Sequence, residues 1–420
     1  FSQFYERDTS WDSDGADVNR SAIATDLDLE GYARKDGREL GAEFSGGYDR
    51  DFVDSDDTGS RISRLFVEGS LGDRRTGLRL GRQSETGRGV FGRFDGGLGW
   101  FGLPERVRWN LVAGYPVDTT SVPHPETERR FWGLSADLEG GAWGDWTVYF
   151  LDQRADGLVD RRAVGAEVRK SDEWSSLYGL LDYDVSYRSL NLFLLSGTWR
   201  TQARTTFHAS VDHRWSPFLT TSNALVGQDE DDLGDLRDRL SEDEIRDLAR
   251  DRTARSTSVT VGVSKPLTDR VQVNLDLLAT KMGGTEDSGG VVGTDPTGPD
   301  YYATIQFIVT DLLMEGDLSL LGVRVADTES SRRYALDLNN RYPFGRAWRL
   351  NPRLFLEHRD GKDGRGDQDR VRPQFRIHYR PDRRWTLELD AGAEWFREEW
   401  DGDAEITRGY FFSLGYRLDW

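Results

Sequence analysis

Charged residues near the end of the chain form a basic row followed by an acidic row. The basic row is Arg372, Arg376 and Arg380, and the acidic row is Glu388, Asp390 and Glu394. Residues an even interval apart in an extended strand point to the same face of its sheet. Adjacent antiparallel strands would therefore bring the two rows together. Such rows act either as ion pairs that stiffen a hydrated wall, or as a field that orients a polar solute in a passage.

Other acidic residues could likewise be either solvated wall charges or parts of a binding site. Asp26, Asp28 and Glu30 form a third row with the same spacing. Asp-rich segments at 54–57 and 229–232 offer carboxylates to a divalent cation, but runs of like charge are usually solvated. No His-x-x-His spacing occurs and the chain has no cysteine, so we expect no metal site and no disulfide.

Catalytic constellations are missing from the sequence. Five histidines are present, and His208 shares a strand face with Asp212, but no Ser, His and acid set can be assembled. Neither a GxGxxG turn after a strand nor a P-loop occurs. We therefore predict that the protein is not an enzyme and needs no cofactor.

The elements that would position these side chains alternate with a period of two. In the segment 106–115, Trp109, Leu111 and Ala113 fall on one face, and Arg108 and Asn110 fall on the other. The pattern recurs almost from end to end. It predicts strands near 1–11, 21–34, 39–50, 61–71, 77–83, 89–101, 107–115, 130–139, 144–153, 161–170, 174–184, 190–201, 204–215, 256–265, 271–282, 301–311, 316–326, 332–342, 349–358, 370–380, 385–396 and 407–420.

Composition narrows the class of protein. The chain has 420 residues, a net charge of −19, 46 glycines and 12% aromatic residues, with only 36% hydrophobic residues. The acidic balance argues against nucleic acid as a partner. No run of 18 apolar residues exists, so we expect no transmembrane helix. No basic and apolar leader stands at Phe1, so we expect any signal peptide to have been removed.

The connections between strands differ in length. Tight links at 35–37, 265–269 and 381–384 contrast with long acidic, glycine-rich loops. The long loops are 51–60, 116–129, 285–300, 359–369 and 397–406. Counting strands back from the C-terminus places every long loop at one end, as in an outer-membrane barrel. A soluble sandwich is the alternative, since it also produces alternation. The number of strands, the charged face and the aromatic residues near strand ends favour the barrel; those aromatics are Trp132, Trp146, Trp385, Trp395 and Tyr410.

One segment, 217–255, interrupts the rhythm of strands. Leu233, Leu236 and Leu240 have helical spacing, and Ser241 with Glu244 resembles a capping box. We expect two short helices near 230–240 and 241–252. The insertion either covers the rim as a solvated hairpin or enters the lumen as a plug.

Short motifs resemble known barrels. Gly81, Arg82 and Gln83, followed by the glycine-rich segment 89–96 with Arg93 and Asp95, resemble porin-type barrels. The alternating aromatic C-terminal strand resembles the signal that the barrel-insertion machinery reads. Segments 222–228 and 248–254 resemble barrel domains joined to tetratricopeptide repeats, as in cellulose-export and poly-N-acetylglucosamine-export porins. This resemblance implies a channel and a periplasmic export partner.

These observations predict one transmembrane antiparallel β-barrel over 1–420, with about 20–22 strands, or 16–18 if the weaker strands are loops. It would lie in the outer membrane of a Gram-negative bacterium, in contact with lipid and lipopolysaccharide. We expect an aqueous channel for polar solutes or a secreted polysaccharide. A structural barrel that holds a partner such as an electron-transfer cytochrome is the alternative. The expected solute path is lined by the rows described above, with Asp26 and Asp28, and by the porin-like residues Arg82, Gln83, Arg93 and Asp95.

Overall fold

The computed structural model describes residues 1–12, 15–72, 75–102, 106–122, 124–141, 143–400 and 402–420. These residues form 22 strands, so the higher predicted number is confirmed and the alternative of 16–18 is wrong. The strands are β1 (Ser2–Trp11), β2 (Ala16–Lys35), β3 (Arg38–Asp51), β4 (Gly59–Leu71), β5 (Thr76–Gly87), β6 (Val90–Gly102), β7 (Val107–Pro116), β8 (Arg129–Gly141), β9 (Gly144–Ala155), β10 (Leu158–Ser171), β11 (Ser175–Asp184), β12 (Ser189–Arg200), β13 (Thr206–Ser216), β14 (Ala254–Pro266), β15 (Val271–Met282), β16 (Asp300–Thr310), β17 (Leu318–Asp327), β18 (Ser331–Phe344), β19 (Trp348–Gly361), β20 (Asp367–Tyr379), β21 (Trp385–Trp400) and β22 (Asp403–Leu418).

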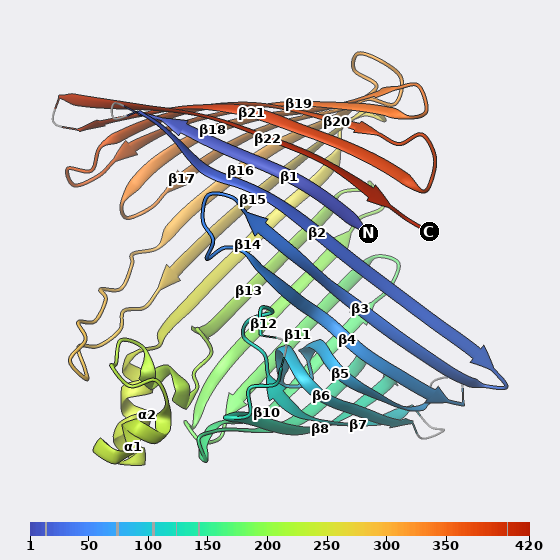
Figure 1. Ribbon diagram of the computed structural model, residues 1–420, viewed down its shortest axis with the longest axis vertical. Coiled ribbons are helices and arrows are strands. Elements are labelled where there is room, and N and C mark those ends of the chain that lie inside the picture. The colour runs from blue at the N-terminus through green and yellow to red at the C-terminus, as the bar shows by residue number, and fades with distance from the viewer. Residues whose placement is uncertain (13–14, 73–74, 103–105, 123, 142, 401) are drawn as a thin grey trace.

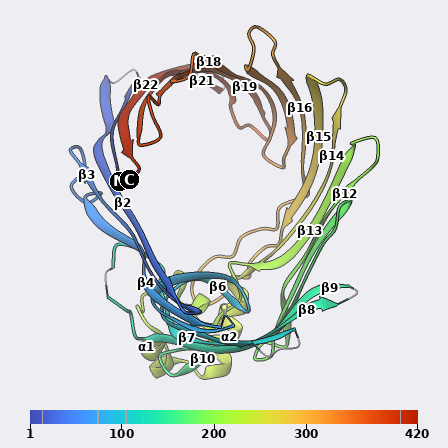
Figure 2. The ribbon, with the colours of Figure 1, turned by 90° about the vertical axis from the view of Figure 1, so that its right-hand side faces the viewer.

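The sheet is closed into a cylinder. Each strand pairs antiparallel with the next, and β1 pairs with β22 from Ser2 opposite Arg417 to Trp11 opposite Arg408. The two termini consequently lie side by side at one end, and the strands form a ring (Figures 1 and 2). Closure pairs the first strand with the last, so neither is left as a free edge of the sheet, as a sheet in lipid requires. Twenty-two strands about 4.8 Å apart and tilted by roughly 40° enclose a cylinder roughly 40 Å across.

The two faces of the wall differ as the alternation predicts. On β7, Trp109 and Leu111 point outward and are 45% and 57% exposed, whereas Asn110 between them points inward and is 5% exposed. Trp146 and Trp385 at one end, and Trp132 and Trp395 at the other, also point outward. An apolar outer belt between aromatic girdles is the surface that a bilayer solvates. The chain therefore has the architecture of an outer-membrane β-barrel.

The lengths of the connections confirm that the long loops all lie at one end of the barrel, and they correct the predicted bounds of two loops. The segments 52–58, 117–128 and 283–299 all lie at one end, here called the loop end, and the termini lie at the opposite, turn end. Residues 123 and 401, within two predicted loops, lie outside the described residues. The predicted loops 359–369 and 397–406 are wrong in extent, because β19 to β22 continue through these charged segments and leave only 362–366 and 401–402. Polar strand ends beyond the bilayer lack the apolar alternation that marks a strand.

The insertion between β13 and β14 contains the 3-10 helix η1 (Thr221–Leu225), α1 (Leu233–Arg239) and α2 (Glu242–Asp251). Both predicted α-helices are confirmed, and η1 was not predicted. A fully buried set of side chains joins the helices to the β9–β10 and β11–β12 connections: Ala155, Leu158, Tyr187, Leu219, Leu233, Leu236 and Ile245 are its main members. Figure 2 shows the helices against one side of the ring rather than across its centre. The insertion thus covers the rim of the barrel, as in the first predicted arrangement, and does not enter the lumen as a plug. Neither described helix is long and apolar enough to cross a membrane.

The capping box at α2 gives a first prediction. The Ser241 amide donates to Glu244, 2.8 Å away, and this bond lowers the pKa of the Glu244 carboxyl below its usual 4.5. A carboxyl with a lowered folded-state pKa stabilises the helix above its ordinary pKa, and this contribution is lost as the pH falls through the folded value. We expect the first turn of α2 to lose protection from hydrogen exchange, after correction for the intrinsic rate, as the pH falls below the ordinary pKa of 4.5 and through the lowered pKa of folded Glu244. Glu244→Gln, which carries no charge, should abolish this pH dependence.

Candidate functional site: the lumen wall and the in-folded hairpin

The β5–β6 hairpin leaves the wall and folds into the lumen. Pairing between β4 and β5 ends at Leu65 opposite Arg82, and pairing between β6 and β7 ends at Phe94 opposite Pro116. The bend is at Gly81, and two observations show that this position requires glycine. Its φ is +126°, and a Cβ added there would lie only 2.2 Å from the Leu65 carbonyl oxygen. Figure 2 shows β6 inside the ring, beside β7 and β10.

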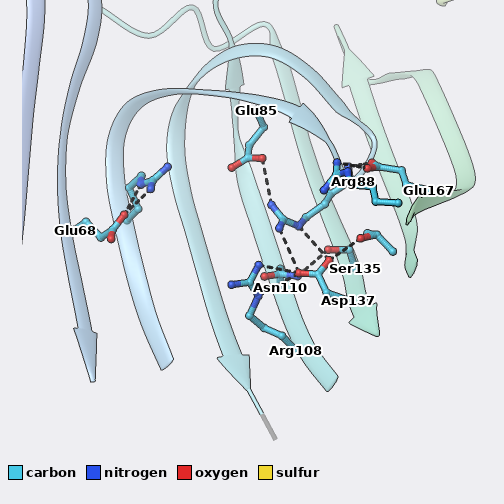
Figure 3. A network of polar contacts seen from close by, with 11 residues as sticks. Glu68, Glu85, Arg88, Arg108, Asn110, Ser135, Asp137 and Glu167 are labelled. Carbon is cyan, nitrogen blue, oxygen red and sulfur yellow. Dashed lines mark hydrogen bonds and ion pairs between the residues drawn. The ribbon is translucent and has the colours of Figure 1, made fainter. Parts of the chain in front are cut away.

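An ion-pair network fixes the tip of the hairpin to the inner face of the neighbouring wall, at β8 and β10 (Figure 3). Arg88, at the turn, pairs with Asp137 of β8 at 3.2 Å and with Glu85 of its own strand at 3.2 Å. Its backbone amide donates to Glu167 of β10 over 2.6 Å. The tip is therefore held by β8 and β10, three and five strands along the wall from β5.

Asp137 is the acceptor at the centre of this network. Besides Arg88, it accepts from Arg108 at 2.9 Å, from Asn110 at 3.1 Å and from Thr147 at 2.9 Å. These donors come from β7 and β9, on either side of β8. A buried carboxylate with this many donors is costly to remove, because every donor would lose its partner.

A second ion pair supports the hairpin from β10 and β11. Asp182 is completely buried, pairs with Arg161 and accepts from the Tyr149 hydroxyl at 2.7 Å. Arg161 in turn donates to the Gly89 carbonyl at 2.8 Å and lies over the ring of Phe91. Asp182 thus acts on the hairpin through Arg161.

Apolar contacts complete the attachment. Val90, Phe94 and Leu98 of β6 pack on Val112 and Leu151 of the inner wall. At the rim, Phe91 stacks on Phe218 of the insertion with ring centroids 5.2 Å apart. The hairpin is therefore packed over its length and is not a free loop.

The porin-like residues lie together at the bend. Arg82 forms a two-pronged ion pair with Asp95, both bonds 2.8 Å long, and also donates to the Val122 carbonyl. Gln83 is buried and donates to the Gly96 carbonyl at 3.2 Å, and Arg93 donates to the Ser63 carbonyl at 2.9 Å. All four side chains tie the hairpin base to its surroundings. Three of them bond to backbone carbonyls, which indicates a structural contribution at this position.

The loop 117–128 covers the part of the wall that the hairpin leaves. The Thr120 carbonyl accepts from the Ile62 amide of β4, and the Val117 amide donates to the Arg93 carbonyl of β6, both over 2.9 Å. The loop thereby links β4 to β6 above the bend at Gly81.

The basic and acidic rows on β20 and β21 face each other across the strand pair, as their spacing predicts. Arg372 pairs with Glu394 at 3.0 Å, and Arg376 donates to Asp390 at 2.8 Å and lies 3.3 Å from Glu388. Arg380 differs, because β20 ends at Tyr379 and Arg380 lies in the turn that follows. Most of these charges are neutralised within the wall.

Acidic side chains on β2 are also partnered. Asp26 pairs with Arg61, and Asp28 accepts from the Ser45 hydroxyl at 2.6 Å. His208 lies 2.8 Å from Asp276 rather than beside Asp212. Among the described residues, no group of three or more histidine, aspartate or glutamate side chains is arranged to hold a metal ion.

The sequence did not predict the hairpin network. The strands near 77–83 and 89–101 were predicted, but β5 continues to Gly87 and only two residues separate it from β6. Arg88 and Gly89, both with positive φ, form that turn. The glycine was the one local signal in the sequence for a tight two-residue turn between two strands. Contacts of Arg88 with Asp137 and Glu167 span 49 and 79 residues, and no local pattern encodes them.

Comparisons with known proteins add little to this geometry. No family model matches the chain, and no curated protein sequence matches it. Among solved structures, Pseudomonas aeruginosa OccK1 (OpdK) has a TM-score of 0.46 at 9% identity, covering 100% of this chain and 97% of that chain. Pseudomonas aeruginosa OccK2 (OpdF) has a TM-score of 0.42 at 10% identity, covering 100% and 98%. The P pilus usher (PapC) translocation pore has a TM-score of 0.44 at 12% identity, covering 100% of both. Likenesses at this level carry no argument about function.

Proposed function

We propose that the protein is an outer-membrane channel for small polar solutes, with its narrowest part at the in-folded β5–β6 hairpin. The inner wall carries charged and hydroxyl side chains that remain accessible inside the cylinder: Glu6 and Asp276, for example, are 48% and 42% exposed. A polar, accessible inner face supports a water-filled lumen rather than a packed interior.

The hairpin is the observation that carries the proposal. A cylinder of 22 strands is wide enough to need a restriction if it is to be selective. The hairpin enters the lumen and is fixed there by Arg88, Asp137 and Asp182. Such a fixed element narrows the passage on one side and favours small solutes over a polymer. No contact among the described residues specifically favours polysaccharide export or the holding of a cytochrome.

Single-channel recording in planar bilayers tests the proposal. We expect an open, ohmic current, because the helices lie at the rim and do not cross the ring. Liposomes containing the protein should also swell faster in small sugars than in oligosaccharides. Absence of current from correctly folded protein would overturn the channel and favour the structural role.

A further inference from the structure

A row of polar side chains crosses the outer wall of the barrel near the loop end. His213 of β13 lies directly opposite Thr257 of β14, and Thr257 lies directly opposite Lys281 of β15. The row shares the outward face with Val259, which is two residues from Thr257 and 41% exposed. Arg255, two residues from Thr257 in the other direction, also points outward. Two cations and a histidine therefore lie close together on the outer wall.

None of these three basic side chains has a carboxylate partner among the described residues. Arg255 lies over the Trp215 ring, 3.8 Å from its centroid, and its hydrogen bonds go to neutral oxygen atoms. The Nδ1 atom of His213 lies 2.8 Å from the Thr257 hydroxyl. Lys281 is exposed. The positive charge of this patch is consequently left uncompensated.

Other outward charges at the loop end are neutralised by their neighbours. Asp327 pairs with Arg332 at 3.2 Å and with Lys362 at 2.6 Å. Arg397 pairs with Glu399 at 2.7 Å. The patch on β13 to β15 thus differs from these groups, and its field attracts an anion from outside the barrel.

Aromatic side chains place the patch at the surface of the membrane. Trp215 lies two residues beyond His213 on the same face of β13. Tyr301 of β16 lies opposite Ala279, two residues from Lys281, and is 56% exposed. Outward aromatic residues mark the level of the lipid headgroups, and the short turns of such barrels face the periplasm. The patch therefore lies among the headgroups of the outer leaflet.

An apolar groove continues from the patch along the outer wall. It has a volume of about 330 Å³, and its lining includes Val259, Val261, Ala279, Ala303 and Val325. The two alanines are small, and the valines on β14 and β17 stand on either side of them. The groove is therefore a channel in the wall surface that an acyl chain fits, directly beside a site for an anion.

We propose that the patch and the groove together bind one lipid A moiety of lipopolysaccharide, with a phosphate at Lys281 and Arg255 and an acyl chain in the groove. Lipid A is the phosphorylated, acylated glycolipid of the outer leaflet, so its phosphates lie at the level of the patch. Arginine and lysine both form charge-assisted hydrogen bonds to phosphate. The site lies outside the barrel, so it does not rest on the proposed channel function.

The test counts lipid A bound to the full chain in a nonionic detergent by native mass spectrometry. We expect one lipid A molecule with both phosphates to bind, and removal of the phosphates to weaken binding about tenfold or more. Lys281→Gln/Arg255→Gln should weaken binding to a similar extent. Lys281→Gln alone changes an exposed side chain and should weaken binding about fivefold without affecting folding.

The control for charge is Lys170→Gln. Lys170 is exposed and points outward from β10, like Val164 and Val168, but it lies at the turn end. This variant should bind lipid A like the unaltered protein. Equal weakening in Lys170→Gln and Lys281→Gln would show a general effect of net charge and overturn the site.

The control for the groove compares two outward alanines. Ala303→Phe fills the groove and should weaken binding of lipid A, whereas Ala393→Phe on β21, far from the groove, should not. Equal binding by both variants would overturn the assignment of the groove.

Competition and conductance complete the test. Phosphatidylglycerol that displaces lipid A at equal concentration would show a site for any anionic lipid and overturn the assignment to lipid A. The single-channel current of Lys281→Gln should equal that of the unaltered protein, because Lys281 is outside the lumen. A protein that conducts but binds no lipid A loses the lipid site and keeps the channel.

Discussion

Replacing Ser84–Arg93 by an Asn-Gly turn should raise the single-channel conductance roughly twofold or more, because the element that enters the lumen would be gone. The replacement keeps Gln83 opposite Phe94, the pair at which the shortened hairpin would close. Asn-Gly forms the tight turn that connects two antiparallel strands directly. Conductance in planar bilayers at fixed salt measures the effect, and oligosaccharides excluded by the unaltered protein should enter.

The control shortens a connection that does not enter the lumen. Replacing 52–58, between β3 and β4 at the same end of the barrel, by the same turn should leave the conductance nearly unchanged. If the hairpin variant folds and conducts like the unaltered protein, the narrowest part of the passage lies elsewhere. That result would contradict the role we give to the hairpin.

The second large effect is expected from Asp182→Ala. This change leaves the Arg161 guanidinium buried without its ionic partner and removes the acceptor of the Tyr149 hydroxyl. Loss of one member of a buried ion pair costs about 3–5 kcal/mol. We expect the free energy of unfolding in urea to fall by about this amount. The current should also fluctuate between two levels, because Arg161 holds the Gly89 carbonyl of the hairpin.

Asp152→Ala is the matched control for this experiment. Asp152 is also buried and pairs with two arginines, Arg154 and Arg162, but neither of these bonds to the hairpin. It should destabilise the barrel without adding a second current level. Equal fluctuation in both variants would indicate a general loosening of the wall and would refute the specific support of the hairpin.

Most of the fold could be predicted from the sequence, because the alternation of strand residues is a local property. All 22 predicted strands are present, and the helices and the capping box at Ser241 and Glu244 are confirmed. Strand ends were less predictable. β19 to β22 continue through charged residues such as Arg397, Glu398 and Glu405, where pairing continues but apolar alternation has ended.

The candidate site was predictable only in part. The opposed rows on β20 and β21 follow from spacing in adjacent strands, so Arg376 and Asp390 were correctly expected to meet. The inward fold of the hairpin follows from a bend at Gly81 and contacts with strands far along the chain, which spacing does not encode. For the same reason the sequence does not distinguish paired Arg372 from unpaired Arg353, since both are inward arginines in alternating strands.

The central claim is a closed cylinder with hydrocarbon outside and water inside, and the absence of native cysteine allows a direct test of it. Single cysteines at Thr304, Ile305 and Gln306 of β16 alternate between the two faces, with Thr304 and Gln306 inward. In intact membranes, a charged water-soluble thiol reagent should modify Thr304→Cys and Gln306→Cys rapidly and Ile305→Cys at least about tenfold more slowly. Equal modification at all three positions, or faster modification at Ile305→Cys, would contradict the barrel and the channel together.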